Sequence, residues 1–156
     1  MKIALLFVGK TETGYLPAAI AMYAERLTRY AAVEVKIVPE PKNAGSLSEQ
    51  EQKKREGELI LSAVGDGEVL LLDERGKEFS SEEFSAFLSK KMQGSAKLIT
   101  FVSGGAYGFS EEVYRRANGK IALSRMTFSH QMVRLFFVEQ LYRAFSIMKG
   151  EPYHHK

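Results

Sequence analysis

The C-terminal part of the sequence contains a segment that is too apolar for an ordinary surface helix. Its apolar residues recur with a helical period, but they cover more than the single stripe that such a helix buries. One face can pack on the chain's own sheet, and the other indicates a second copy of the chain, since a monomer rarely leaves a large apolar patch in water. The alternative is a helix buried wholly within its own domain. The apolar positions of residues 131–149 are Met132, Val133, Leu135, Phe136, Phe137, Val138, Leu141, Ala144, Phe145, Ile147 and Met148.

The residues before this helix form a loop that follows a strand. Residues 121–123 are apolar and predict a short buried strand, whereas residues 124–129 are too polar and irregular to continue it. The helical period begins near His130. A loop that leads from a strand to a helix lies at the carboxyl edge of a sheet, where open α/β sheets bind ligands. We therefore expect a ligand site at this loop.

The whole chain alternates between strand and helix patterns. The continuous apolar run at Val69–Leu72 is typical of a strand covered on both faces, as in a parallel sheet. The sequence therefore predicts one domain over residues 1–156, an α/β fold with a mostly parallel sheet of about five strands and helices on both faces. The expected strands are 3–8, 33–38, 68–73, 98–102 and 121–123, and the expected helices begin near residues 15, 48, 80, 110 and 130, with residues 49–58 expected to be solvated.

Composition excludes several classes of protein. The chain has no cysteine, so disulfides and thiolate nucleophiles are excluded. Its three histidines form no H-x-x-x-H pair, so we expect no metal. The apolar run at the N-terminus predicts a buried strand and not a signal peptide, and no run approaches the roughly 20 apolar residues of a membrane span. We expect a cytoplasmic protein that does not bind membranes. The net charge of +3 permits an anionic partner without requiring one.

Three loops should meet at one edge of the sheet, namely residues 73–76, 103–108 and 124–129. The glycines of the second loop permit a close approach to a ligand, but their spacing does not fit a dinucleotide-binding G-x-G-x-x-G motif. The sequence offers no Ser-His-Asp arrangement and no carboxylate pair with a recognisable spacing. His130 lies one turn before Arg134. It is either a catalytic residue or a helix-terminal residue with a local hydrogen bond.

The sequence contains four distinctive segments: Phe101–Gly105, Leu123–Arg134, Glu139–Phe145 and Gly150–Lys156. Together they resemble the small SPOUT-class methyltransferases that modify a pseudouridine of bacterial 23S ribosomal RNA. The resemblance extends over the whole chain. It implies an α/β fold with a C-terminal trefoil knot, an exception to the general absence of knots. It also implies a homodimer that uses S-adenosyl-L-methionine to methylate N3 of a pseudouridine, on the large subunit or the assembled ribosome.

The resemblance also implies where the methyl donor binds. One departure from the family pattern is Ser129, where the family usually has proline before the histidine. This change alters the rigidity of the loop, although serine can still cap the helix. The residues that the resemblance assigns to the donor pocket are Leu72, Gly104, Leu123, Ser124, Arg125, Met126, Thr127 and Phe128.

The candidates for action on the RNA base are His130, Arg134, Tyr153 and His154. They would orient the base, assist loss of its proton or stabilise the developing oxyanion. Arg125 and the basic helix pairs would hold phosphates. The tail is either a frayed end or, in a dimer, a cover over one of the two pockets. Two other functions stay open: a non-catalytic RNA-binding module, and a methyltransferase for another RNA or a small molecule.

Overall fold

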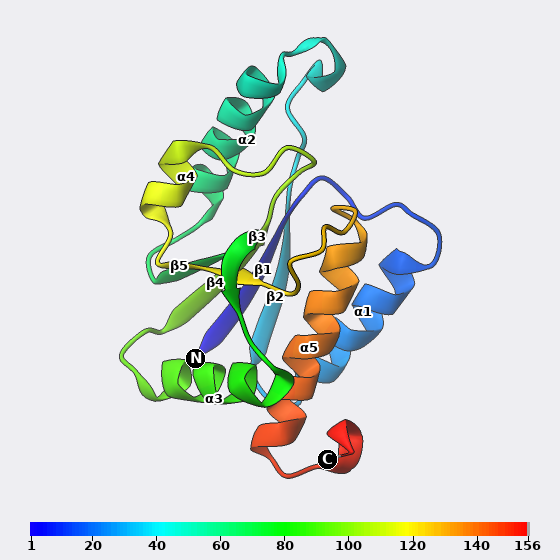
Figure 1. The fold of residues 1–156 in the computed structure, drawn as a ribbon, viewed down its shortest axis with the longest axis vertical. Coiled ribbons are helices and arrows are strands. Elements are labelled where there is room, and N and C mark those ends of the chain that lie inside the picture. The colour runs from blue at the N-terminus through cyan, green and yellow to red at the C-terminus, as the bar shows by residue number, and fades with distance from the viewer. Residues whose placement is uncertain (156) are drawn as a thin grey trace.

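A five-stranded parallel sheet forms the centre of the computed structural model, which describes residues 1–155 (Figure 1). The strands follow the order β2-β1-β4-β3-β5. This confirms the predicted α/β class. The strands are β1 (Lys2–Val8), β2 (Ala32–Val38), β3 (Glu68–Glu78), β4 (Leu98–Ser103) and β5 (Gly119–Ala122), and the helices are α1 (Leu16–Leu27), α2 (Glu49–Ala63), α3 (Ser81–Gln93), α4 (Glu111–Arg116) and α5 (Met132–Met148), with short 3-10 helices η1 (Ala44–Ser46) and η2 (Pro152–His154).

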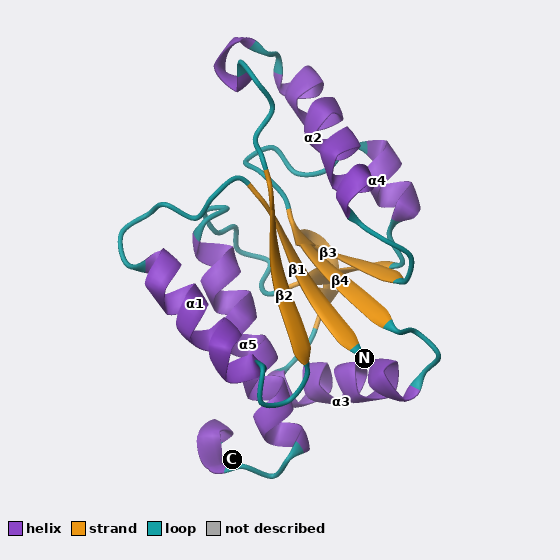
Figure 2. Cartoon of the chain, turned by 180° about the vertical axis from the view of Figure 1, so that it is seen from behind, coloured by secondary structure: helices purple, strands orange, loops and turns teal. Residues whose placement is uncertain are grey.

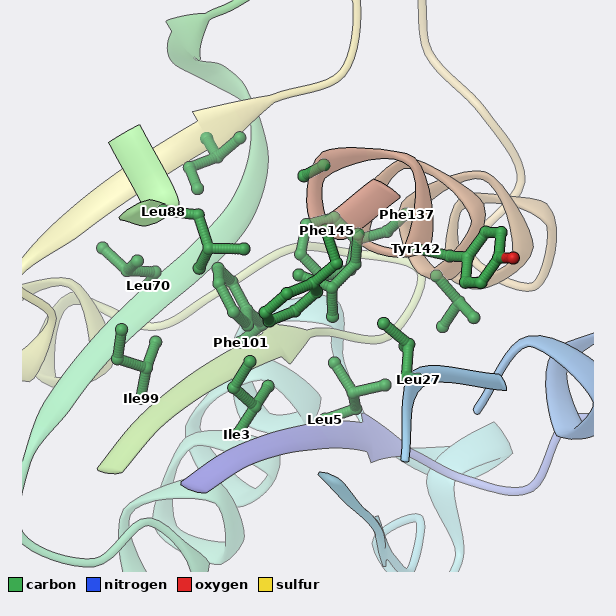
Figure 3. Close-up of a cluster of buried hydrophobic side chains, with 14 of the residues drawn as sticks. Ile3, Leu5, Leu27, Leu70, Leu88, Ile99, Phe101, Phe137, Tyr142 and Phe145 are labelled. Atoms are coloured by element: carbon green, nitrogen blue, oxygen red, sulfur yellow. The ribbon is translucent and has the colours of Figure 1, made fainter. Parts of the chain in front are cut away.

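Both faces of the sheet carry helices (Figure 2). Because side chains alternate along a strand, β1 sends Ile3, Leu5 and Phe7 to one core and Leu6 and Val8 to the other. The larger core lies under α1, α3 and α5, and Figure 3 shows its aromatic and aliphatic side chains. The smaller core lies under α2 and α4. Residues 3–8 of β1 are all buried, as expected of a strand covered on two sides.

Strand β3 is longer than predicted. It was expected to end at Asp73, but it continues to Glu78 after an irregularity between Leu72 and Lys77. Ile121 of β5 therefore pairs with β3 twice, once on each side of this irregularity. Gly76 allows β5 to lie this close to the irregular part of β3, since a Cβ at residue 76 would stand 2.6 Å from the backbone nitrogen of Ile121. The trefoil knot implied by the resemblance stays a prediction.

Helices α2 and α3 begin at the serines that the sequence predicts as N-caps. The Ser48 side chain accepts a hydrogen bond from the Glu51 backbone, and Ser80 forms a complete capping box with Glu83. The prediction that residues 49–58 are solvated was wrong at two positions, Glu56 and Gly57, which are both buried. Glu56 is only 3% exposed, because the turn of α2 that carries it packs inward, against the loop that follows β4.

Helix α5 packs against both α1 and α3, so its own chain covers it on two sides. Phe137, Val138, Leu141 and Phe145 are buried in the larger core. Phe136 is different, since it is 42% exposed. The most exposed apolar side chain that α5 offers to another molecule thus lies in its N-terminal half. None of the helices in residues 1–155 is long and apolar enough to cross a membrane.

Candidate functional site

A cavity of about 560 Å³ lies at the carboxyl edge of the sheet. The irregular part of β3, the loop after β4 and the loop after β5 all line it. This confirms that the three loops meet, as the alternation of strands and helices predicted. Of the eight residues that the resemblance assigns to a donor pocket, all but Arg125 line this cavity. The Arg125 side chain is 88% exposed and lies 3.5 Å from Glu78.

The end of β4 and the loop after it form one wall of the cavity, through residues 103–109. Gly108 has a φ of +82°, a conformation that side chains rarely adopt. Gly104 packs directly on the buried ring of Phe109, because a Cβ at residue 104 would stand 2.9 Å from Phe109 Cε1. Ser110 ends the loop and caps α4 by accepting a hydrogen bond from the Val113 backbone. The contact between Gly104 and Phe109 and the cap formed by Ser110 therefore hold the two ends of this wall in place.

A polar cluster from the irregular part of β3 also lines the cavity. The Tyr114 hydroxyl donates to the Asp73 carboxylate, and the Arg75 backbone N–H donates to the same side chain at 2.8 Å. Burial acts to raise the pKa of Asp73, but the hydrogen bonds from Tyr114 and Arg75 bring it below its usual value. Asp73 is therefore a fixed negative charge at the pocket. The sequence places the loop 73–76 at this edge but gives no sign of a role for Asp73, whose partner Tyr114 is 41 residues away along the chain.

His130 and Ser129 line the cavity from the start of α5. Ser129 accepts a hydrogen bond from the backbone of Met132, the first residue of α5, at 3.1 Å, so the serine holds the turn that leads into the helix, although the N-cap position itself is Gln131. The neighbouring Gln131 side chain accepts from the Glu12 backbone and donates to the Lys10 carbonyl. The start of α5 is thus tied to the loop after β1, and His130 is held between two anchored residues.

Arg134 does not line the cavity. Its side chain is fully buried, and its guanidinium donates to the backbone carbonyls of Val8 and Gly9 and to the Thr11 hydroxyl at 2.6 to 2.9 Å. Burial lowers the pKa of Arg134, and the charge of Glu40 partly opposes this. The structure thus places Arg134 behind the site. We propose that it positions the end of β1 and the start of α5.

Replacing Arg134 with methionine should lower the free energy of unfolding by about 3 kcal/mol, because the buried carbonyls of Val8 and Gly9 lose their donors. Urea unfolding of the two proteins without ligand would measure the difference. The matched control is Arg125→Met, which removes an exposed guanidinium and should change stability by less than about 0.5 kcal/mol. Equal stability of the Arg134→Met and unmodified proteins would contradict this role.

Tyr153 and His154 lie at the other end of α5, on the short helix η2 (Figure 1). The Tyr153 hydroxyl lies 3.0 Å from both Glu139 and the Tyr23 hydroxyl. Burial and these two partners raise the pKa of Tyr153. His154 Nδ1 lies 3.1 Å from Arg143, and its Nε2 lies 3.0 Å from Glu82. The described tail is therefore a packed element and not a frayed end; Lys156 lies outside the described residues.

The two groups of candidate residues are separated within one chain. His130 precedes α5 and His154 follows it, and a helix of 17 residues is about 25 Å long. A single chain thus does not bring Tyr153 and His154 to the cavity that His130 lines. Any site that uses all of them needs a second chain.

The sequence is similar to known and predicted methyltransferases over nearly its whole length. A family model described as "Predicted SPOUT methyltransferase" matches residues 1–154. Proteins named "Ribosomal RNA large subunit methyltransferase H" are 57% identical in Christiangramia forsetii and 55% identical in Parabacteroides distasonis, each over 157 residues that cover all of both chains.

A solved structure shares the fold. It is that of a probable methylase family protein from Haemophilus influenzae, with a TM-score of 0.55 at 14% identity, and the match covers 97% of this chain and 69% of that one. At this identity the likeness supports the fold alone. The family match and the two full-length relatives show that the chain belongs to the SPOUT methyltransferase family, and that it is a methyltransferase.

Proposed function

We propose that this methyltransferase uses S-adenosyl-L-methionine to methylate N3 of a pseudouridine in 23S ribosomal RNA, on the large subunit or the assembled ribosome in the cytoplasm. The observation that carries the proposal is that Leu72, Gly104 and residues of the 123–128 loop line one cavity. These residues come from β3 where it becomes irregular, from the loop after β4 and from the loop after β5. The full-length relatives named ribosomal RNA large subunit methyltransferase H support ribosomal RNA of the large subunit as the acceptor.

The residues present fit the methyl donor. A volume of about 560 Å³ lies in the usual range for small-molecule sites. Leu72, Leu123 and Phe128 offer apolar surface, and the ionised Asp73 offers an acceptor for amino or hydroxyl groups. Bound there, S-adenosyl-L-methionine would supply an already activated methyl group. The chain's main contribution would then be to hold donor and acceptor nitrogen in line and to exclude water.

The acceptor nitrogen must lose a proton, since N3 of a uracil-type ring is a weakly acidic imide. His130 lies at the pocket, and an imidazole can accept a proton near neutral pH. Tyr153 offers a flat ring on which a base can stack, and His154 offers a second imidazole. In our proposal His130 and His154 handle the proton, and Tyr153 orients the base. Arg134 acts only through the residues that it holds in place.

We propose that the enzyme is a homodimer in which the tail of each chain completes the pocket of its partner. An apolar groove of about 360 Å³ runs beside the start of α5 and is lined by residues that include Phe79, Phe128 and Phe136. The rings of Phe128 and Phe136 lie 5.2 Å apart, and both are exposed. If a two-fold axis pairs two such surfaces with their α5 helices antiparallel, the tail of one chain would extend toward the cavity of the other.

Phe136→Glu should convert the dimer to a monomer, because it places a charge in the centre of this apolar surface. Size-exclusion chromatography with light scattering would measure the mass. The matched control is Met22→Glu, which changes an exposed apolar residue of α1. We expect the control to stay dimeric and the Phe136→Glu protein to lose methyl transfer. A fully active monomer would contradict the proposal that the tail acts across a dimer.

Mass spectrometry of ribosomal RNA tests the function itself. Digests from cells with and without the gene should differ by one methyl group on a pseudouridine of 23S ribosomal RNA, and the purified enzyme should restore it. If the protein does not bind S-adenosyl-L-methionine, it is an RNA-binding module instead. If it binds the donor and 23S ribosomal RNA is unchanged, the acceptor is another molecule.

A further inference from the structure

Glu56 places a buried carboxylate directly behind the glycine wall of the cavity. The residue belongs to α2, on the face of the sheet opposite α5, and it contributes no atom to the cavity lining. The backbone N–H of Gly105 donates to its carboxylate, and Gln52 Nε2 donates to Oε2 at 3.1 Å. Gly105 itself lines the cavity. One peptide unit thus touches Glu56 on one side and the ligand space on the other.

The contact between Glu56 and the loop is tight. A Cβ at residue 105 would stand 2.6 Å from Oε1 and 2.8 Å from Oε2 of Glu56, well inside van der Waals distance. The loop backbone therefore lies so close to the carboxylate that a side chain at residue 105 has no room, and movement toward α2 is opposed. The hydrogen bond from the Gly105 N–H opposes movement in the other direction. The carboxylate thereby fixes the distance between the Gly104–Gly105 backbone and the rest of the cavity.

Glu56 is an unfavourable choice for stability alone. Burying a carboxylate costs free energy unless its hydrogen bonds compensate for lost hydration. Here burial dominates and raises the pKa of Glu56, although Gln52 and Gly105 oppose the rise. The titratable groups that act on it from other elements are Glu40, which adds to the rise, and His130, which opposes it. Perturbed carboxyls of this kind gather at functional sites.

We propose that Glu56 is a positioning residue of the methyl-donor pocket, whose carboxylate sets the location of the Gly104–Gly105 backbone against which the donor binds. The inference rests on the proposed use of S-adenosyl-L-methionine. The inference adds to the donor site a residue, Glu56, that lies on the opposite face of the sheet from α5 and acts only through the loop after β4. Its effect should therefore appear in donor affinity, and it should be coupled to the side chain at residue 105.

A double-mutant cycle on Glu56 and Gly105 tests this coupling. Titration calorimetry with S-adenosyl-L-methionine gives the donor Kd of the full-length protein, and urea unfolding gives its stability. Glu56→Ala should raise the donor Kd about tenfold or more, because the loop loses a charged hydrogen-bond partner. Gly105→Ala should raise it by a similar factor, because the new methyl group collides with the carboxylate.

In the Glu56→Ala background the collision is gone, so adding Gly105→Ala should change the donor Kd by less than about twofold. Glu56→Gln supplies a conservative variant that keeps the size of the side chain and an acceptor for the Gly105 N–H. It should hold the donor Kd within about threefold of the unmodified protein, and Gly105→Ala should remain harmful beside it. Glu58→Ala is the matched control, because it removes an exposed carboxylate from the same helix.

Independent effects of the two substitutions on donor Kd would overturn the inference. So would a Glu56→Ala protein that loses stability but binds the donor as well as the Glu58→Ala control does. If Glu56→Ala fails to fold, two other proteins decide the question, namely the single variant Glu56→Gln and the double variant that combines it with Gly105→Ala. Unchanged donor affinity in both proteins would remove Glu56 from the site. A failure of the unmodified protein to bind the donor would instead overturn the proposed function, and this inference with it.

Discussion

A protein that lacks residues 153–156 is expected to bind S-adenosyl-L-methionine with unchanged affinity but to transfer methyl groups at least about a hundredfold more slowly, as is usual when an acid-base group is lost. The donor cavity lies before α5 and the tail lies after it, so truncation leaves the cavity intact. Calorimetry would measure donor binding, and transfer of a labelled methyl group to ribosomes from cells without the gene would measure the rate.

The truncation should also lower the melting temperature. The ring of Tyr153 lies 4.8 Å from that of Tyr142, and its hydroxyl lies 3.0 Å from Glu139, so these contacts are lost. His154→Ala is the control that separates stability from catalysis, because it leaves Tyr153 packed while removing the imidazole. If the truncated enzyme works at close to the full rate, Tyr153 and His154 have no catalytic role and the tail only stabilises the fold.

Mixing two inactive variants is expected to restore activity. One variant is Gly104→Val, in which the new side chain collides with Phe109 and disturbs the donor pocket. The other is the truncation, which has a pocket but no tail. If the tail of one chain serves the pocket of its partner, each mixed dimer contains one complete site. Random exchange of equal amounts should therefore restore about a quarter of the wild-type activity, half of the dimers being mixed and each having one working site of two.

The same mixture distinguishes the two possible arrangements. If each tail served the pocket of its own chain, a mixed dimer would contain no complete site and activity would stay at the level of the separate variants. The control is to mix each variant with itself under the same exchange conditions. Steady-state methyl transfer, measured beside light scattering to confirm that dimers have formed, provides the readout.

The sequence predicted the layers of the fold because its local signals agreed with one another. Apolar runs marked the strands, and Ser48, Ser80 and Ser110 marked the helix starts within a residue or two. The meeting of three loops followed from the alternation of strand and helix. The end of β3 was missed because residues 73–76 look like a turn, and only their contact with β5 makes them part of a longer strand.

The details behind the cavity could not be predicted from local patterns. Arg134 looks like a surface residue on a helix, but its partners Val8 and Gly9 are more than 120 residues away along the chain. Glu56 stands in a run of charged residues and gives no sign of burial. The packing of Tyr153 on Tyr23 and Glu139 likewise depends on contacts between distant segments. Such contacts are set by tertiary structure, which overrides the local signal at these positions.

The position of β1 between β2 and β4 has a consequence for the synthesis of the protein. Lys2 pairs with Leu98 of β4, so one side of the first strand stays without its partner until about 95 further residues have been made. At the usual rate of translation this takes roughly 5 to 20 seconds. During that time an edge with the wholly apolar sequence Ile3–Val8 can pair with other chains. We expect newly made chains to depend on chaperones until β4 has emerged.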